Sequence, residues 1–170
     1  KGCWPLSPYA GWLLFHLAAA GQHLQQRSAL SLLSEAFNNR RTSIITGFDW
    51  QLHATDIWSE DLERELLIAE EGGNRGTIVH AYANVMAKVG QHLAKDEEKL
   101  LRAVVLASKL GLVAQDRVNA AEALASLSGL SIHTAEKYLK SLEDERNVLS
   151  WDDRFNQFEI IGDTVSRPQF

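Results

Sequence analysis

DEEKLLRAVVLASKLG (residues 96–111) opens the stretch that decides the fold, and VLSW (148–151) and FEII (158–161) close it. In the opening segment, apolar residues recur at the spacing of one helix face. Asp96 can cap the start of this helix, and Gly111 can end it. The segment therefore predicts a first amphipathic helix, against which the rest of the stretch can fold.

Two more helices and a hairpin are predicted after it. The second helix runs from Asp116 to Gly129, and the third opens at Ser131, whose hydroxyl can cap it. The residues expected to face inward from these two helices are Val118, Ala121, Leu124, Ala125, Ala135, Leu139 and Leu142. The two β-prone runs are separated by residues 152–157, which indicates a hairpin. Three short helices followed by a two-stranded ribbon is the order of a winged helix-turn-helix.

The first half of the chain is predicted to be helical. Apolar patterns indicate helices over 9–20 and 25–37, a helix from Thr55 or Ser59 to Gly72, and another over 75–93, with a loop and a possible short strand over 42–55. The residues expected to face inward are Leu30, Leu33, Phe37, Leu62, Leu66, Ala69, Ile78, Tyr82, Val85, Met86, Val89 and Leu93. The predicted fold class is mainly α. A helical, lid-like bundle (1–94) is followed by a winged helix-turn-helix with a small β-hairpin (95–162) and by a tail (163–170), and the two folded regions are expected to pack as one body.

Composition bounds the function classes. The 170 residues carry a net charge of −5, with a pI near 5.7 and 45% hydrophobic residues, so the totals indicate a globular protein without the basic surplus of a dedicated nucleic-acid binder. The single cysteine, Cys3, cannot form an internal disulfide. No apolar run reaches the ~20 residues of a membrane span, and no leader pattern is present. We expect a cytoplasmic protein, and the start at Lys1 without a methionine suggests part of a longer one.

The sequence offers no catalytic or metal-binding constellation. The glycine cluster GGNRGT (72–77) lacks the lysine and the spacing of a phosphate-binding P-loop, so the chain alone is not expected to hydrolyse ATP. The six histidines do not occur at ligand spacing with cysteines or carboxylates. The pairs Glu70-Glu71 and Glu97-Glu98 stand at predicted helix ends, where solvated charge is the ordinary interpretation. We assign no catalytic residue and no metal ligand.

The third predicted helix is where a winged helix would read DNA. The residues expected to point outward there are His133, Thr134, Lys137, Lys140, Ser141 and Asp144. From 131 to 146, the cations Lys137, Lys140 and Arg146 stand against Glu136, Glu143, Asp144 and Glu145, a net charge of −1. Phosphate contacts by Lys and Arg supply most non-specific DNA affinity, so this helix is poorly equipped for it. The candidate nucleic-acid contacts are His133, Thr134, Lys137, Lys140 and Arg146, and the alternative is packing against neighbouring domains.

Three arginines in the first half are candidates for phosphate contact. Arg40 and Arg41 follow two asparagines at a predicted helix end, where they could meet a phosphate or simply be solvated. Arg27 stands at the start of an amphipathic helix, from which a guanidinium can reach a bound γ-phosphate.

The opening WPLSPYAGWLLFHL (4–17) and the later QRSALSLL (26–33) resemble a pattern in large bacterial P-loop ATPases, including the ATPase components of BREX/Pgl-type anti-phage systems and related restriction-linked ATPases. Ser7 replaces the histidine usual in that turn. The resemblance implies that the chain is the lid and winged-helix part of an AAA+-like ATPase whose Walker motifs lie elsewhere. It further implies that ATP and Mg²⁺ bind the parent protein and not this part, and that Arg27 senses the nucleotide.

The leading functional hypothesis is thus a non-catalytic lid and winged helix that couples the nucleotide state of an ATPase, in anti-phage defence, to a protein or DNA partner. Other domains or subunits of that ATPase would be its partners, and no membrane is involved. One alternative is a stand-alone winged-helix DNA-binding regulator. Another is a structural interaction module that docks through exposed aromatic residues such as Trp4, Trp58 or Phe170.

Overall fold

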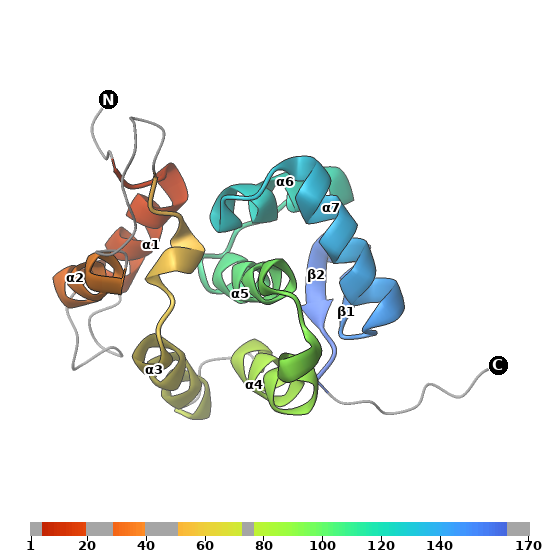
Figure 1. Ribbon diagram of the computed structural model, residues 1–170, viewed down its shortest axis with the longest axis horizontal. Coiled ribbons are helices and arrows are strands. Elements are labelled where there is room, and N and C mark those ends of the chain that lie inside the picture. Colours follow the sequence, from red (N-terminus) through yellow and green to blue (C-terminus); the bar gives the residue numbers. More distant parts are fainter. Residues whose placement is uncertain (1–4, 20–28, 40–50, 73–76, 163–170) are drawn as a thin grey trace.

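The computed structural model describes residues 5–19, 29–39, 51–72 and 77–162. Within these ranges the chain is predominantly helical, with one two-stranded antiparallel sheet near its carboxyl end, so the predicted fold class is confirmed (Figure 1). The elements are α1 (Pro8–Ala19), α2 (Ala29–Asn39), a 3₁₀ turn η1 (Ala54–Ile57), α3 (Glu60–Glu71), α4 (Ile78–Val89), a 3₁₀ turn η2 (Gly90–His92), α5 (Lys95–Lys109), α6 (Arg117–Ser128), α7 (Ile132–Lys140), a π turn η3 (Ser141–Glu145), β1 (Leu149–Asp152) and β2 (Gln157–Ile160).

Helix α5 is the centre of the molecule. Its residues Leu100, Leu101 and 103–106 are all buried, while Lys95 is exposed and Arg102 is half-buried, so α5 is amphipathic with a broad apolar face. Figure 1 shows α5 between the amino-terminal helices and the carboxyl-terminal hairpin, and it contacts α4, η1, α6, α7 and β2. A helix with so broad an apolar face needs a larger body to pack against. Elements from both predicted regions supply that body, and they form one hydrophobic core.

The winged helix forms with the predicted end signals for α6 and α7. The carboxylate of Asp116 accepts a hydrogen bond from the N–H of Asn119 (Oδ1 to N, 2.8 Å), and the Ser131 hydroxyl accepts one from the N–H of Thr134 (3.2 Å). Gly111 and Gly129 follow α5 and α6 at φ values of +64° and +71°. After each glycine the next leucine closes the helix end: Leu112 N–H bonds to Ala107 O and Leu130 N–H to Ala125 O, both at 3.0 Å.

The hairpin pairs Leu149 with Ile160 and Trp151 with Phe158 in antiparallel register. The rings of Trp151 and Phe158 meet edge to face, with centroids 5.0 Å apart. Phe158 and Ile160 are buried against the helices, while Gln157 and Glu159 are exposed, which is the alternation expected of a strand with one covered face.

The Pro-Leu-Ser-Pro turn has a structural role at the amino end. Pro8 is the first residue of α1, and the hydroxyl of Ser7 accepts a hydrogen bond from the N–H of Ala10 (3.2 Å), which caps the helix. Leu6 forms a parallel bridge to Leu52, with Ser7 N–H bonded to Leu52 O (2.9 Å) and Leu52 N–H to Pro5 O (2.7 Å). The turn therefore fixes α1 beside the segment that leads into η1.

An aromatic and arginine cluster joins η1, α4 and α5. Trp58 and Tyr82 pack edge to face with centroids 5.2 Å apart, and Arg102 of α5 donates from Nε to the Tyr82 hydroxyl (3.1 Å). The guanidinium carbon of Arg102 lies 5.8 Å from the Trp58 ring centroid, and Arg102 also pairs with Glu98. Trp58 is buried in this cluster, so its predicted role as an exposed docking residue is wrong, and Trp4 and Phe170 lie outside the described residues.

Three further details differ from the sequence-based expectations. Leu30 is 76% exposed, and α2 instead buries Leu32 and Ala36, because the neighbours of a helix decide which of two apolar stripes is covered. Val118 is 58% exposed at the start of α6. Helix α5 begins at Lys95, and Ala94 rather than Asp96 is its capping position.

No helix among the described residues has both the length and the apolar character to cross a bilayer.

The two helix-ending glycines provide a matched stability test. A Cβ at Gly129 would lie 2.3 Å from the His53 ring, whereas one at Gly111 would meet nothing within 4 Å. We expect Gly111→Ala to lower the free energy of unfolding by about 1 kcal/mol, the cost of a left-handed alanine, and Gly129→Ala by about 2–4 kcal/mol because His53 must also move. Urea unfolding of both variants measures this, and equal losses would contradict the contact between η1 and α6.

Candidate functional site

The outer face of α7 carries most of the predicted nucleic-acid contacts. His133, Lys137 and Lys140 are exposed and follow one another at intervals of four and three residues, so they share one face of the helix. Thr134 is only partly exposed, and its hydroxyl accepts a hydrogen bond from the Ser131 hydroxyl (2.8 Å) at the helix start. The structure thus brings three of the predicted residues together and uses the fourth in a helix cap.

Arg146 is directed toward the fold. Its Nε lies 3.5 Å from Oε1 of Glu97, whose side chain is 2% exposed at the start of α5. The same carboxylate accepts hydrogen bonds from the Ser141 hydroxyl (2.7 Å) and, through Oε2, from the Ala94 N–H (2.8 Å). Burial by itself would raise the pKa of Glu97, but these hydrogen bonds and the charge of Arg146 outweigh burial and hold it below its ordinary value. Arg146 therefore compensates a buried charge and ties the π turn to α5.

The other arginines of the winged helix are also paired. Arg117 forms an ion pair with Glu143 and lies over the Phe158 ring, with its guanidinium carbon 5.3 Å from the centroid. At the tip of the hairpin, Arg154 pairs with Asp152 (Nη2 to Oδ2, 3.1 Å). This leaves α7 with two exposed lysines beside exposed carboxylates, which are few cations for binding phosphates.

Arg27, Arg40 and Arg41 lie outside the described residues, so the structure does not place these three candidates for phosphate contact.

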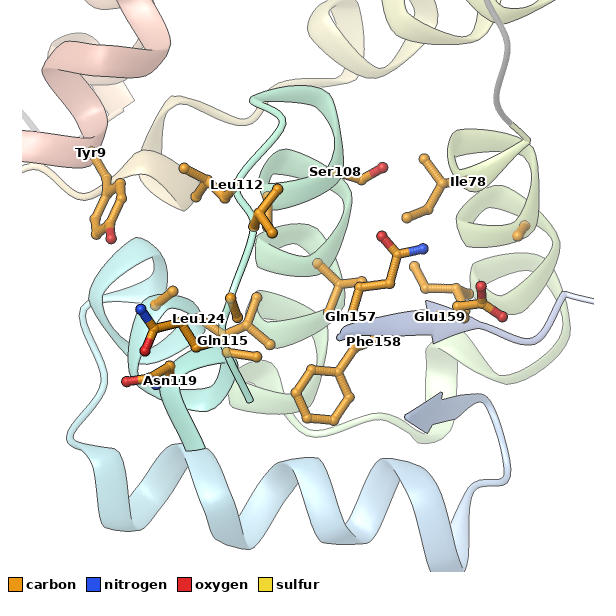
Figure 2. A pocket seen from close by; sticks show the side chains of 18 of the residues that line it. Tyr9, Ile78, Ser108, Leu112, Gln115, Asn119, Leu124, Gln157, Phe158 and Glu159 are labelled. Atoms are coloured by element: carbon orange, nitrogen blue, oxygen red, sulfur yellow. The ribbon is translucent and has the colours of Figure 1, made fainter. Parts of the chain in front are cut away.

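A pocket of about 620 Å³ lies away from the predicted contacts, between α4, α5, α6 and β2 (Figure 2). Its volume is within the range of pockets that bind ligands. The apolar part of its wall includes Val104, Ala107 and Leu124. Polar groups from six segments surround this part: Tyr9, Thr77, Ser108, Gln115, Asn119, Gln157 and Glu159. An apolar floor with a few polar groups around it is the usual character of a binding site.

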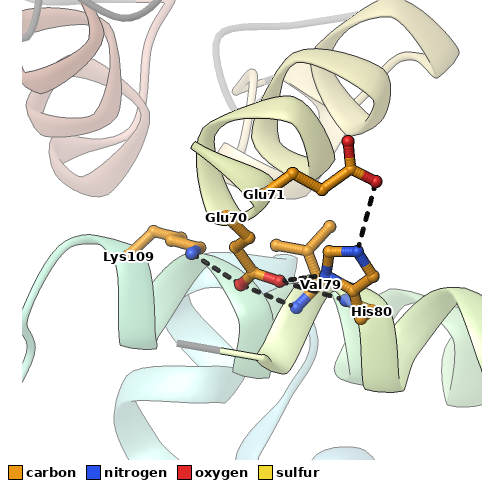
Figure 3. A network of polar contacts seen from close by, with 5 residues as sticks. All are labelled: Glu70, Glu71, Val79, His80 and Lys109. Atoms are coloured by element: carbon orange, nitrogen blue, oxygen red, sulfur yellow. Dashed lines mark hydrogen bonds and ion pairs between the residues drawn. The ribbon is translucent and has the colours of Figure 1, made fainter. Parts of the chain in front are cut away.

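A second polar cluster, at Glu70, connects α3, α4 and α5 (Figure 3). The Glu70 carboxylate accepts hydrogen bonds from the N–H of Val79 (3.0 Å), the N–H of His80 (3.2 Å) and the Lys109 ammonium (2.7 Å). Nδ1 of His80 lies 2.8 Å from its Oε2. Glu70 thus serves as the cap of α4, where the positive end of the helix dipole favours a carboxylate. Because donors occupy both oxygens of its carboxylate, we assign Glu70 a structural role and not that of a catalytic base.

Opposing effects set the pKa values in this cluster. Burial by itself would raise the pKa of Glu70, but the hydrogen bonds from Lys109, Val79 and His80 outweigh burial and hold it below its ordinary value. The hydrogen bond to Glu70 raises the pKa of His80, and the charges of Glu70 and Glu71 add to this effect, while partial burial opposes it.

The interpretation of both glutamate pairs as solvated helix ends is wrong for one member of each. The side chain of Glu70 is 1% exposed while that of Glu71 is 69% exposed, and Glu97 is buried while Glu98 pairs with Arg102. A buried carboxylate is stable only if it is hydrogen-bonded and paired, and apart from the N–H of Ala94, three positions from Glu97, the partners here come from residues 9 to 49 positions away. The sequence shows the glutamates but gives no signal of those partners.

Among the described residues, no group of three or more His, Cys, Asp or Glu side chains is arranged to hold a metal ion.

Comparison of the chain with protein-family models, curated proteins and solved structures found no match.

The pocket could not be read from the sequence. Its walls combine segments from Tyr9 to Ile160, and none of them carries a motif. The one local signal is the segment 112–115 between α5 and α6, which is too apolar for an ordinary loop and places Val113 fully on the surface.

The cluster at Glu70 predicts a pH dependence of stability. Because the pKa of His80 is raised in the fold, the stability from its charged form is fully present below the unfolded pKa of about 6.5 and is lost as the pH rises through the folded value. We expect the wild type to exceed His80→Gln in free energy of unfolding by more at about pH 6 than at about pH 9, where Glu70 is charged throughout.

Urea unfolding at both pH values measures this difference. His92→Gln is the matched control, because His92 is exposed on the turn after α4 and lies outside the cluster. A difference between wild type and His80→Gln that does not change with pH would contradict the assignment.

Proposed function

We propose that this chain is a non-catalytic winged-helix module of a larger P-loop ATPase, and that it couples the nucleotide state of that ATPase to a protein partner. The observation that carries the proposal is the single core around α5, to which the amino-terminal helices and the winged helix both contribute. Because packed interiors transmit displacement instead of absorbing it, a shift of the amino-terminal helices would move the hairpin.

Contacts across the two predicted regions support such coupling. The His53 ring beside η1 packs on Gly129 at the end of α6, Lys109 of α5 holds Glu70 of α3, and Gly162 after β2 lies against Ala81 of α4. A stiff body of this kind suits a relay between an ATPase core and a partner. In this proposal Arg27 senses the nucleotide and anti-phage defence is the cellular process, both on the strength of the resemblance.

A protein partner is favoured over DNA by the charges. In the winged helix, Arg117, Arg146 and Arg154 each pair with a carboxylate, and the exposed face of α7 offers two lysines. A DNA-binding protein gains most of its non-specific affinity for DNA from cations that are available to phosphates. The pocket beside β2 offers instead the mixed apolar and polar surface that suits a peptide or protein segment.

A DNA titration separates the proposal from the DNA-binding regulator. With labelled duplex at about 50 and about 200 mM salt, we expect at most non-specific binding, with a Kd of about 10⁻⁴ M or weaker at the higher salt. Lys137→Ala/Lys140→Ala is compared with the control Lys95→Ala/Lys99→Ala, which changes two lysines of α5. Submicromolar binding at the higher salt that is lost only in the α7 variant would favour the regulator.

The same preparation tests the non-catalytic assignment. Incubated with ATP and Mg²⁺, the chain should release no phosphate above the buffer control. Turnover by the chain alone would overturn the proposal.

A further inference from the structure

The edge of β2 that faces the pocket carries main-chain groups without partners among the described residues. Ile161 donates its N–H to Val148 O (2.8 Å), which shows that Val148 and Ile161 are a hydrogen-bonded pair of the antiparallel ladder. In an antiparallel pair, hydrogen-bonded and non-hydrogen-bonded residue pairs alternate, so Glu159 bonds to Ser150 and Gln157 to Asp152. The N–H and C=O of Phe158 and Ile160 therefore point to the opposite edge, away from β1.

That edge is part of the pocket wall. All four residues of β2 line the pocket, and Figure 2 shows β1 on one side of β2 and Ser108 and Ile78 on the other. Phe158 and Ile160 are 6% and 9% exposed as whole residues, and both line the pocket while their side chains pack in the core. Within the described residues, no backbone hydrogen bond reaches these groups from outside the hairpin, not even from the segment 112–115 across the pocket.

We propose that this pocket binds an extended segment of the partner protein, which adds to the free edge of β2 as a third strand. The inference rests on the proposed function in taking the partner to be a protein, and it names the form in which that partner is bound. Phe158 and Ile160 repeat their N–H and C=O at about 6.6–6.8 Å, two residues of a strand, and an extended peptide matches that repeat.

The remaining wall defines the side chains of the bound segment. Opposite β2, the pocket is lined by Val104, Leu124 and the small residues Ala107, Ala120 and Ala123, which leave room for branched aliphatic side chains. Among the described lining residues, Glu159 is the only acidic or basic one, and it is exposed. The segment is therefore an alternation of aliphatic and polar residues with a lysine or arginine near Glu159.

The probe is a fluorescein-labelled peptide of alternating valine and threonine with a lysine at one end, followed by fluorescence anisotropy and by ¹⁵N spectra of the intact chain. We expect binding with a Kd below about 1 mM, and shifts concentrated on the amides of Phe158 and Ile160. In the free chain these two amides should exchange with solvent faster than those of Gln157 and Glu159, and the peptide should slow them.

Two pairs of variants test the site itself. Ser108→Trp places a large ring at the mouth of the pocket and should abolish binding, while Ser126→Trp on the exposed face of α6 should not. Glu159→Lys should weaken the lysine peptide by roughly 3-fold and favour its glutamate counterpart, whereas Glu122→Lys should leave both unchanged. All four positions are exposed or at the pocket mouth, and circular dichroism verifies that each variant is folded.

N-methylation of alternate peptide residues tests strand addition, because it removes the N–H groups along one edge of the peptide. Methylation in one register should abolish binding, and methylation in the other should not.

The proposal is overturned if neither the lysine nor the glutamate peptide shifts Phe158 or Ile160 at about 1 mM, or if both registers bind equally. It is also overturned if the chain dimerises and Ser108→Trp abolishes the dimer, since the occupant is then a second copy. None of these results alters the DNA titration, so failure here leaves the proposed function standing.

Discussion

Two buried carboxylates hold α5 in place, one at each of its ends, and the rest of the structure depends on them. At the amino end Glu97 accepts hydrogen bonds from Ala94 and Ser141 and pairs with Arg146. At the carboxyl end Lys109 reaches Glu70, which caps α4. An unpaired charge in these positions would cost several kcal/mol, so each carboxylate forces specific neighbours into place. The apolar surface of α5 supplies the driving force, and the two carboxylates fix the arrangement.

This construction bears directly on function. The amino-terminal helices and the winged helix are not separate domains joined by a linker, because α5 and its neighbours form one core. A body built in this way fits the proposed role of a relay, in which a displacement passes from one region to the other. The four arginines of the winged helix each pair with a carboxylate, whereas the pocket beside β2 and the exposed lysines of α7 are available to a partner.

Much of the fold could be predicted because its signals are local. Asp116, Ser131, Gly111 and Gly129 end or begin helices through contacts within a few residues, and the stripe from Ile78 to Leu93 shows one apolar face at helical spacing. Each of these signals acts through the chain's own neighbourhood and needs no knowledge of distant partners.

The rest depends on distant contacts. Helix α2 has apolar residues on two faces, and only the packing of α1 and η1 against it selects Leu32 and Ala36 over Leu30. The sequence predicts Glu70 and Glu97 to be solvated surface residues, because most of their partners lie far along the chain. For the candidate site, the sequence placed His133, Lys137 and Lys140 on one exposed face, but it could not show that Arg146 is paired or that β2 borders a pocket.

The central claim is that the amino-terminal helices and the winged helix form one cooperative unit around α5. Trp58 lies in the first and Trp151 in the second, so two variants that keep one of these tryptophans and replace the others with phenylalanine report on each region separately. For each variant, urea unfolding followed by tryptophan fluorescence and by far-UV circular dichroism should give the same midpoint and the same slope, because a single cooperative transition is seen alike by both probes. Two separate transitions, with one region folded while the other is unfolded, would contradict the account.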